Sequence, residues 1–169
     1  MLKTLALILI SLSSSLFAKA IDWKDARFEI RVPENWREVK DFYGIPVTLL
    51  GPSVAPKPRV VIQIIPTDLP PATMNAKEAK NFGEKYAEGR RSWISQQDGE
   101  IYDILPGKFD RDRLIAGVSY RLNKKSYIER THYINCKRRL YHLKIVLNVE
   151  NRDELPEAES VVRSFACAD

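Results

Sequence analysis

The sequence has few of the residues that usually perform catalysis or hold a metal ion. Two cysteines and two histidines occur among its 169 residues, and it contains no GxSxG, HExxH, GxGxxG, CxxC or P-loop pattern. His132 and His142 lie on neighbouring predicted strands, on opposite faces if the turn between them has two residues, and each is expected to have a hydrogen-bond partner. Two imidazoles without a third ligand make a poor zinc site. The sequence therefore predicts a protein that is not an enzyme, with no catalytic residues, no metal and no cofactor.

Long hydrophobic runs are absent except near the N-terminus. Lys3, an apolar run at 5–12 and the small-x-small sequence 18–20 together have the pattern of a secretory signal peptide. Serines interrupt the run, which is shorter than the roughly 20 residues that span a bilayer. We expect cleavage after Ala20, which leaves residues 21–169 as a single periplasmic or secreted domain without a transmembrane segment. Retention of residues 1–20 as a membrane anchor is the alternative.

A large excess of charge of one sign is also missing. The formal net charge is +5, and Lys3 and Lys19 leave with the signal peptide while no acid does, so the mature chain carries 5 − 2 = +3. Such a weak field does not favour nucleic-acid binding. Five basic residues should nevertheless meet at one end of the predicted sheet: Arg111, Arg113, Lys137, Arg138 and Arg139.

The clearest structural pattern is a run of three strands, predicted at 113–123, 126–136 and 139–149 and joined by short basic turns. In the first and third of these strands apolar residues recur at every second position, which is typical of a sheet with one buried face. Further strands are predicted at 27–32, 45–50, 59–65 and 100–105. The loops between the predicted strands 27–32 and 45–50 would expose Trp36 and Tyr43.

Two segments have helical periodicity instead. Apolar residues form one stripe in 75–97 and another in 151–165, with Thr73 or Asn75 as the candidate N-cap of the first helix and Asn151 of the second. A strand meander needs a second layer over its apolar face, and these helices can supply it. We therefore predict an α+β fold, in which an antiparallel sheet meander packs against two helices in an α/β/α sandwich.

The two cysteines are predicted to form a disulfide. Cys136 ends the middle strand of the meander, the third strand carries the chain to the other end, and the final helix then brings Cys167 back. An exported chain meets an oxidising compartment, where an even number of cysteines favours a bridge. The alternative is a catalytic thiol, which would need a partnered histidine.

The segment RFEIRVPENW at 27–36 resembles the opening of the PsbP-like α/β/α sandwich superfamily, and the order of predicted elements up to Ser164-Phe165 is similar. That superfamily includes extrinsic photosystem subunits, a Ran-binding transport factor and bacterial envelope proteins of the DcrB type. The resemblance implies non-catalytic binding to a protein partner. It carries over no functional residues, because the members share no single binding site.

These observations predict an exported, non-catalytic accessory or binding protein of the cell envelope that docks to a protein partner. Trp36 and Tyr43 are the candidate contacts, because aromatic residues are enriched at the centres of interfaces. The basic residues Arg111, Arg113 and 137–139 would steer an acidic partner. The alternatives are a module that binds an anionic surface, such as a lipid membrane or a polyanion, and a small-molecule enzyme.

Overall fold

The computed structural model describes residues 17–23, 26–54, 57–67, 76–137 and 139–168. The large sheet contains β3 (Arg37–Phe42), β4 (Ile45–Leu50), β7 (Val60–Thr67), β8 (Glu100–Asp110), β9 (Arg113–Leu122), β10 (Lys125–Cys136) and β11 (Arg139–Asn148). The other strands are β1 (Phe17–Trp23), β2 (Ala26–Val32), β5 (Ser53–Val54), β6 (Lys57–Pro58) and β12 (Ala166–Cys167). The helices are α1 (Ala76–Ser95), the 3-10 helix η1 (Val149–Glu154) and α2 (Leu155–Arg163).

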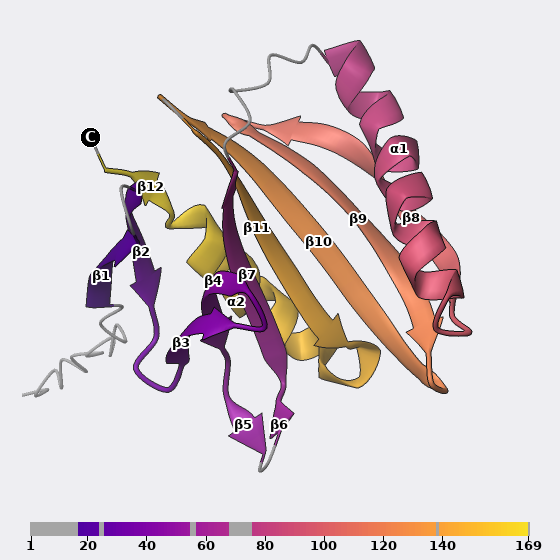
Figure 1. Cartoon of the computed structure of the whole chain (residues 1–169), viewed down its shortest axis with the longest axis horizontal. Helices are drawn as coiled ribbons and strands as arrows, with labels where there is room; N and C mark the ends of the chain where they lie inside the picture. The colour runs from indigo at the N-terminus through magenta and orange to yellow at the C-terminus, as the bar shows by residue number, and fades with distance from the viewer. Residues whose placement is uncertain (1–16, 24–25, 55–56, 68–75, 138, 169) are drawn as a thin grey trace, which may run out of the picture.

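The large sheet has the strand order β3-β4-β7-β11-β10-β9-β8, and all its neighbouring strands are antiparallel. Helix α1 lies on one face, over β8 and β9, and α2 lies on the other (Figure 1). The smaller sheet pairs β1, β2 and β12. This arrangement confirms the predicted α+β class and the α/β/α sandwich.

The predicted meander is present as β9, β10 and β11. The first turn, Asn123-Lys124, has positive φ angles of 51° and 64°, which suit a two-residue hairpin. The second turn also has two residues, because Cys136 pairs with Arg139. The expectation of one buried face is wrong for β9, whose residues are buried on both faces because it lies inside the sheet and beneath α1.

Helix α1 approaches β8 closely at two glycines. A Cβ atom on Gly83 would lie 2.6 Å from the backbone N of Gly107, and a Cβ on Gly107 would collide with the carbonyl of Ala79. On this side Ala87 and Ile94 of α1 pack against Val118 and other side chains of the sheet. The helix therefore covers the β8–β9 side of this face.

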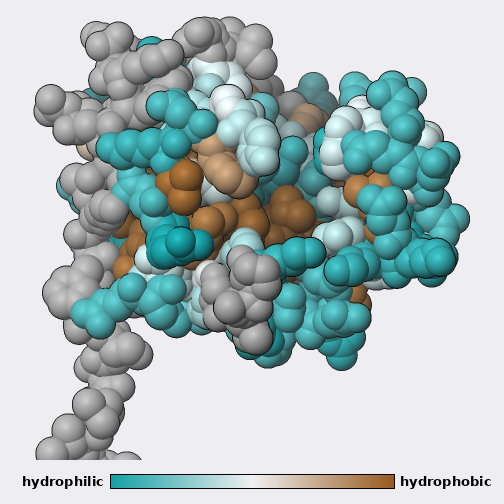
Figure 2. All heavy atoms as spheres, turned by 60° about the horizontal axis from the view of Figure 1, so that its bottom comes forward, coloured by the Kyte–Doolittle hydropathy of each residue, from teal (hydrophilic) through white to brown (hydrophobic). Residues whose placement is uncertain are grey.

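Helix α1 does not extend over the β7–β11 part of the same face. In the central strands β7 and β11 buried residues alternate with half-buried ones, and the half-buried side chains point to the α1 side. The side chains concerned are Val61, Gln63, Ile65, His142, Lys144 and Val146. Figure 2 shows hydrophobic side chains gathered in a hollow between hydrophilic rims, in a view that turns this side of the molecule obliquely forward. We call the surface formed by these six residues the open half-face.

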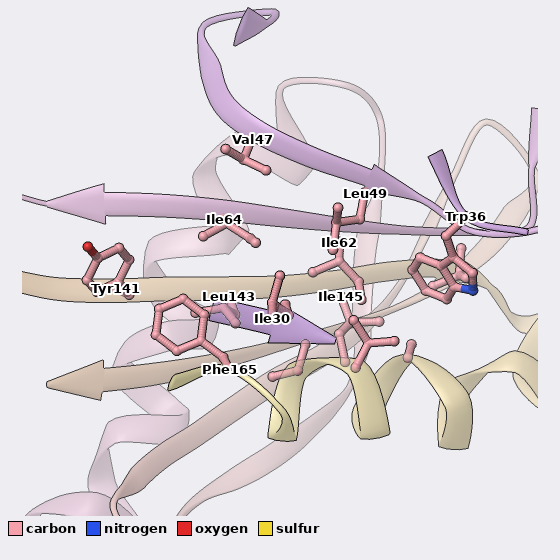
Figure 3. Close-up of a cluster of buried hydrophobic side chains, with 14 of the residues drawn as sticks. Ile30, Trp36, Val47, Leu49, Ile62, Ile64, Tyr141, Leu143, Ile145 and Phe165 are labelled. Atoms are coloured by element: carbon pink, nitrogen blue, oxygen red, sulfur yellow. The ribbon is translucent and has the colours of Figure 1, made fainter. Parts of the chain in front are cut away.

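The main hydrophobic core lies on the opposite face, between the sheet and α2. Ile62, Ile64, Leu143 and Ile145 are fully buried there, and the apolar stripe predicted for the last helix packs onto them (Figure 3). Residues of that stripe in the core are Ala158, Val161, Val162 and Phe165. Burial of each large aliphatic side chain contributes about 1.5–3 kcal/mol, so this layer provides most of the favourable packing energy.

Three local expectations are corrected. The last helical region begins with the 3-10 helix η1, and its N-cap is Asn148, whose side chain accepts from Glu150 N; Asn151 instead accepts from Arg59 Nε at 3.2 Å. Strand β8 continues to Asp110 through an irregularity between Leu105 and Lys108. The segment predicted as loops contains the edge strand β3. The cap predicted at Thr73 or Asn75 and residues 1–16 of the predicted signal peptide lie outside the described residues, whereas Phe17–Ala20 pair with β2.

Candidate functional site

The predicted disulfide is present. Cys136 and Cys167 are bonded, with their Cα atoms 5.7 Å apart. Cys136 ends β10, and Cys167 lies in β12, which follows α2 and pairs with β2. The bridge therefore fixes the end of the chain to the β10–β11 turn.

The predicted exposure of Trp36 is wrong. Its side chain is 6% exposed and lies in the core below α2, where Nε1 donates to Glu157 Oε1 at 3.1 Å (Figure 3). Trp36 N donates to Pro33 O, so the turn after β2 directs the indole inward. Burial of such a large aromatic side chain stabilises the fold more than its exposure to water would. Trp36 is therefore part of the fold and not of a contact surface.

Tyr43 is exposed, as the early-loop position predicted. It lies at the tip of the β3–β4 hairpin, is 90% exposed, and packs edge-to-face on Phe42 with ring centroids 4.6 Å apart. Asp41, Tyr43 and Gly44 all have positive φ angles, and such a conformation is uncommon for residues other than glycine. The hairpin thus holds two aromatic rings at the surface on a constrained backbone.

The predicted contact role of Arg113 does not fit its surroundings. Its side chain is buried and donates to the carbonyls of Val162, Arg163 and Phe165 at 2.5, 3.1 and 3.0 Å. These carbonyls lie at the C-terminal end of α2, where a cation is favourable because the helix dipole is negative there. Arg113 is therefore a helix cap, whereas Arg111 in the β8–β9 turn is exposed.

The remaining predicted basic residues lie near one another at one end of the sheet. Arg113 pairs with Ile134, which places the Arg111 turn beside the turn that contains Lys137. Lys137 is exposed and Arg139 is half-buried, whereas Arg138 lies outside the described residues. Tyr43 is not part of this group, because β7 and β11 separate its hairpin, β3–β4, from β10.

A buried ionic cluster that the sequence analysis did not predict lies between α1 and the open half-face. Glu129 of β10 is 1% exposed and contacts Arg90 Nε at 2.7 Å and Arg90 Nη2 at 3.0 Å. The Tyr86 hydroxyl donates to the same carboxylate and contacts Thr131 Oγ1 at 2.7 Å. Burial, followed by the charge of Glu129, raises the pKa of Tyr86 well above its usual value, so this phenol remains protonated.

Lys144 and His142 extend this cluster over β11. Lys144 Nζ is 4.0 Å from Glu129 Oε1, which is beyond hydrogen-bond distance, and its side chain is 20% exposed. Burial lowers the pKa of Lys144, while Glu129 opposes that shift. His142 packs on the Tyr133 ring, and its buried Nε2 makes no hydrogen bond with a described group. Burial, with a smaller effect of Lys144, lowers the pKa of His142 to about 4.

The second histidine lies on the opposite face, as the two-residue turn predicts. His132 is fully buried, with Nε2 3.0 Å from Glu159 Oε2 on α2, and Arg130 Nη1 contacts the other oxygen of Glu159 at 3.1 Å. Despite burial, these two neighbours lower the pKa of the Glu159 carboxyl. The group connects β10 to α2 within the fold.

One sequence signal points to the cluster around Glu129. Alternate positions of β10 are occupied by Tyr127, Glu129, Thr131 and Tyr133. The carboxylate of Glu129 therefore lies on the same face of the strand as the two tyrosines. The partners of Glu129 could not be predicted from the sequence. Arg90 is 39 residues away on α1, and the position of that helix across the sheet is decided by tertiary packing.

Within the described residues no group of three or more potential ligands is arranged to hold a metal ion. The helices described in the structure also include none that is long and apolar enough to cross a membrane.

Comparison with known proteins identifies the fold. No protein-family model and no curated protein matches the sequence. Among solved structures, cyanobacterial PsbP (CyanoP) of Synechocystis sp. PCC 6803 superposes with a TM-score of 0.63 at 12% identity, covering 92% of this chain and 95% of that one. The Ran-binding protein Mog1p of Saccharomyces cerevisiae gives 0.54 at 11% identity, with 92% and 97% covered. LpqN of Mycobacterium tuberculosis, described as involved in cell envelope biogenesis, gives 0.50 at 15% identity, with 90% and 91% covered.

These matches cover nearly the whole chain, although the sequences are very different. They agree with the resemblance of the segment 27–36, whose tryptophan is a core residue here. The chain therefore has the PsbP-like α/β/α sandwich fold.

Proposed function

We propose that the protein is an exported, non-catalytic accessory protein of the cell envelope, and that it docks to a protein partner through the tip of the β3–β4 hairpin. The observation that carries this proposal is the exposure of Tyr43, 90%, beside Phe42, which is 39% exposed. Aromatic rings held in water cost hydration free energy, which burial against a partner recovers.

The backbone of the hairpin supports a role in contact. Asp41 and Tyr43 adopt φ angles of 51°, and left-handed backbone at non-glycine residues costs free energy and is concentrated at functional sites. No described side chain other than Phe42 forms a ring contact with Tyr43. A fixed hairpin also loses little conformational entropy on binding, so its rings suit an interface anchor.

The basic end of the sheet supplies the electrostatic part of the proposal. Arg111 and Lys137 are exposed there, with Arg139 beside them, and charges of this kind raise the association rate with an acidic partner more than they raise affinity. Their effect should decrease with added salt, because exposed charges are screened over about 8 Å at physiological ionic strength.

Three observations support export and a binding role. The pattern of residues 1–20 is that of a signal peptide. The Cys136–Cys167 disulfide suits an oxidising compartment. Two proteins with this fold are described as a Ran-binding protein and as involved in cell envelope biogenesis. The mature chain, 21–169, would be a single periplasmic or secreted domain.

Site-specific photo-crosslinking tests the docking surface. Benzoylphenylalanine at position 43 should form an adduct with one protein in the native envelope, at both low and moderate salt. The same group at position 102 is the control, because Tyr102 is also exposed, at 50%, but lies on β8 at the far edge of the sheet. Equal adducts at both positions, or none at position 43, would refute docking through the hairpin.

Affinity for the captured partner provides a second test. Tyr43→Ser should weaken binding by about tenfold or more, as the loss of an interface anchor does, while Tyr102→Ser should leave it unchanged. Export is tested separately by the intact mass of the secreted protein, which should begin at Ile21; a mass that includes residues 1–20 would support the anchor instead.

A further inference from the structure

The open half-face combines unused hydrogen-bond donors with an apolar strip. The strand register arranges its side chains in rows, which continue onto the buried residues of β10 and β4. One row runs Thr131, Lys144, Gln63, Thr48, and the next runs Glu129, Val146, Val61, Leu50. A polar row therefore lies directly beside a row that is apolar except for its buried glutamate.

Lys144 is the charged residue of the polar row, and its positive charge is only partly compensated by its neighbours. Its ammonium group is 4.0 Å from Glu129 and makes no hydrogen bond to a described residue. Glu129 is already occupied, because Arg90 Nη2 and the Tyr86 hydroxyl donate to it and Arg90 Nε lies 2.7 Å from it. The three donors of the lysine are consequently available to a ligand.

The charges in this region favour a ligand with a single negative charge. Arg90 and Lys144 contribute two positive charges and Glu129 one negative charge, so the described groups carry +1 together. The Arg90 guanidinium is held over the Trp93 ring, 4.5 Å from its centroid, which fixes its position at the rim. A fixed arginine and a partly desolvated lysine are the groups that bind carboxylates in proteins.

The apolar row gives the rest of the ligand a place to pack. Val146, Val61 and Leu50 follow one another from β11 to β4, across two interstrand spacings or roughly 10 Å. Val146 and Val61 are half-buried, so a ligand lying on them would remove apolar surface from water, whereas Leu50, which is 8% exposed, closes the end of the row.

We propose that the open half-face binds a small monocarboxylate with an unbranched apolar body, with the carboxylate on Lys144 and the body along Val146 and Val61 towards Leu50. This site lies on the sheet face beside α1, so it does not depend on docking through the β3–β4 hairpin.

Titration of the folded full-length chain with octanoate, followed by NMR of the valine and leucine methyl groups, tests the proposal. Octanoate should shift the methyl signals of Val61, Val146 and Leu50 in a saturable manner. Octan-1-ol, which has the same apolar chain without the charge, should bind about tenfold more weakly or worse, because a hydrogen bond to a charged group is lost.

Two variants separate the carboxylate contact from general hydrophobic binding. Lys144→Gln should weaken octanoate by about tenfold and leave octan-1-ol unchanged, whereas Lys85→Gln, at an exposed position of α1, should change neither. Val146→Thr, which keeps the shape of the side chain, should weaken both probes. If octanoate does not bind, binds no better than octan-1-ol, or binds Lys144→Gln equally well, the proposal is wrong.

Discussion

Arg113 has its guanidinium group buried against the C-terminal end of α2, where it donates to three backbone carbonyls. Arg113→Met would keep the volume of the side chain but leave these carbonyls without their charged donor. We expect the free energy of unfolding to fall by about 3 kcal/mol, because hydrogen bonds to charged groups each contribute about 1.5–3 kcal/mol and the lost ones are buried. Urea denaturation measures this loss.

The control for Arg113 is two residues away. Arg111→Met removes the same charge from an exposed turn and should change the free energy of unfolding by less than about 0.5 kcal/mol. Equal effects of the two substitutions would show that the capping contacts contribute little.

His142 makes stability depend on pH between its folded and unfolded pKa values. Burial, and then Lys144, lowers the pKa of His142 to about 4 in the folded protein, from 6.5. Between these values the unfolded chain binds a proton that the folded chain does not, so stability decreases as the pH falls from 6.5 towards 4. His142→Gln should reduce this slope in denaturation midpoints measured from pH 7 to pH 4.

NMR titration of the His142 ring signals measures the pKa of His142 directly. Lys144→Gln removes the second cause of the shift and should raise the pKa of His142 while leaving it below 6.5, because burial remains. A slope that is the same in His142→Gln and in the wild type would contradict the account.

At the scale of the elements, the position of α1 depends on its contact with β8 at Gly83. Gly83→Ala would increase helix propensity by about 1 kcal/mol, but its Cβ would lie 2.6 Å from the backbone of Gly107. Because backbone atoms cannot move aside cheaply, we expect a net destabilisation of about 1–3 kcal/mol.

Gly89 is the matched control on the same helix. A Cβ there meets nothing within 4 Å, so Gly89→Ala should stabilise the protein by about 0.5–1 kcal/mol. The two variants should therefore shift the urea midpoint in opposite directions, and a shift of the same sign would show that α1 does not rest tightly on β8.

The elements that the sequence predicted well are those with a strong apolar period. Strands β9 and β11, and the stripe from Ala158 to Phe165, follow such patterns, and the structure confirms these elements. Strand β3 was missed because REVKDF has no apolar alternation, since an edge strand is half-exposed and its pairing is decided by β4. Residues in β8 beyond Pro106 were missed because proline within a strand pattern usually ends it.

At the scale of the whole molecule, the sequence predicted the layers and their order but not which side chains meet between them. Cys136 and Cys167 were paired correctly, because β11 runs away from Cys136 and the last helix runs back, which places both cysteines at the same end of the sheet. Trp36 was placed on the surface because the burial of a residue in a turn depends on the distant helix α2 that covers it. The contacts of Glu129 depend in the same way on where α1 crosses the sheet.

The disulfide affects the whole molecule, because it joins the last strand to the centre of the meander. Cys136 and Cys167 are 31 residues apart, and a loop of this size contributes about 3–4 kcal/mol by the loop-entropy estimate. The double variant Cys136→Ser, Cys167→Ser should lose this amount in urea denaturation, and reduction of the wild type should produce the same loss. Two free thiols in the exported protein, found by mass spectrometry after alkylation without reductant, would contradict the bridge.

The same double variant should keep α2 in place. Arg113 and the core residues of α2 hold the helix independently of Cys167, so hydrogen exchange should increase in β12 and at its pairing with Phe28 and Glu29 but not in residues 155–163. Because Arg113 and the disulfide both restrain the chain after α2, removing both should not give the sum of the separate losses. Exchange that also increases throughout α2 would show that the disulfide, and not the arginine cap, holds this helix against the sheet.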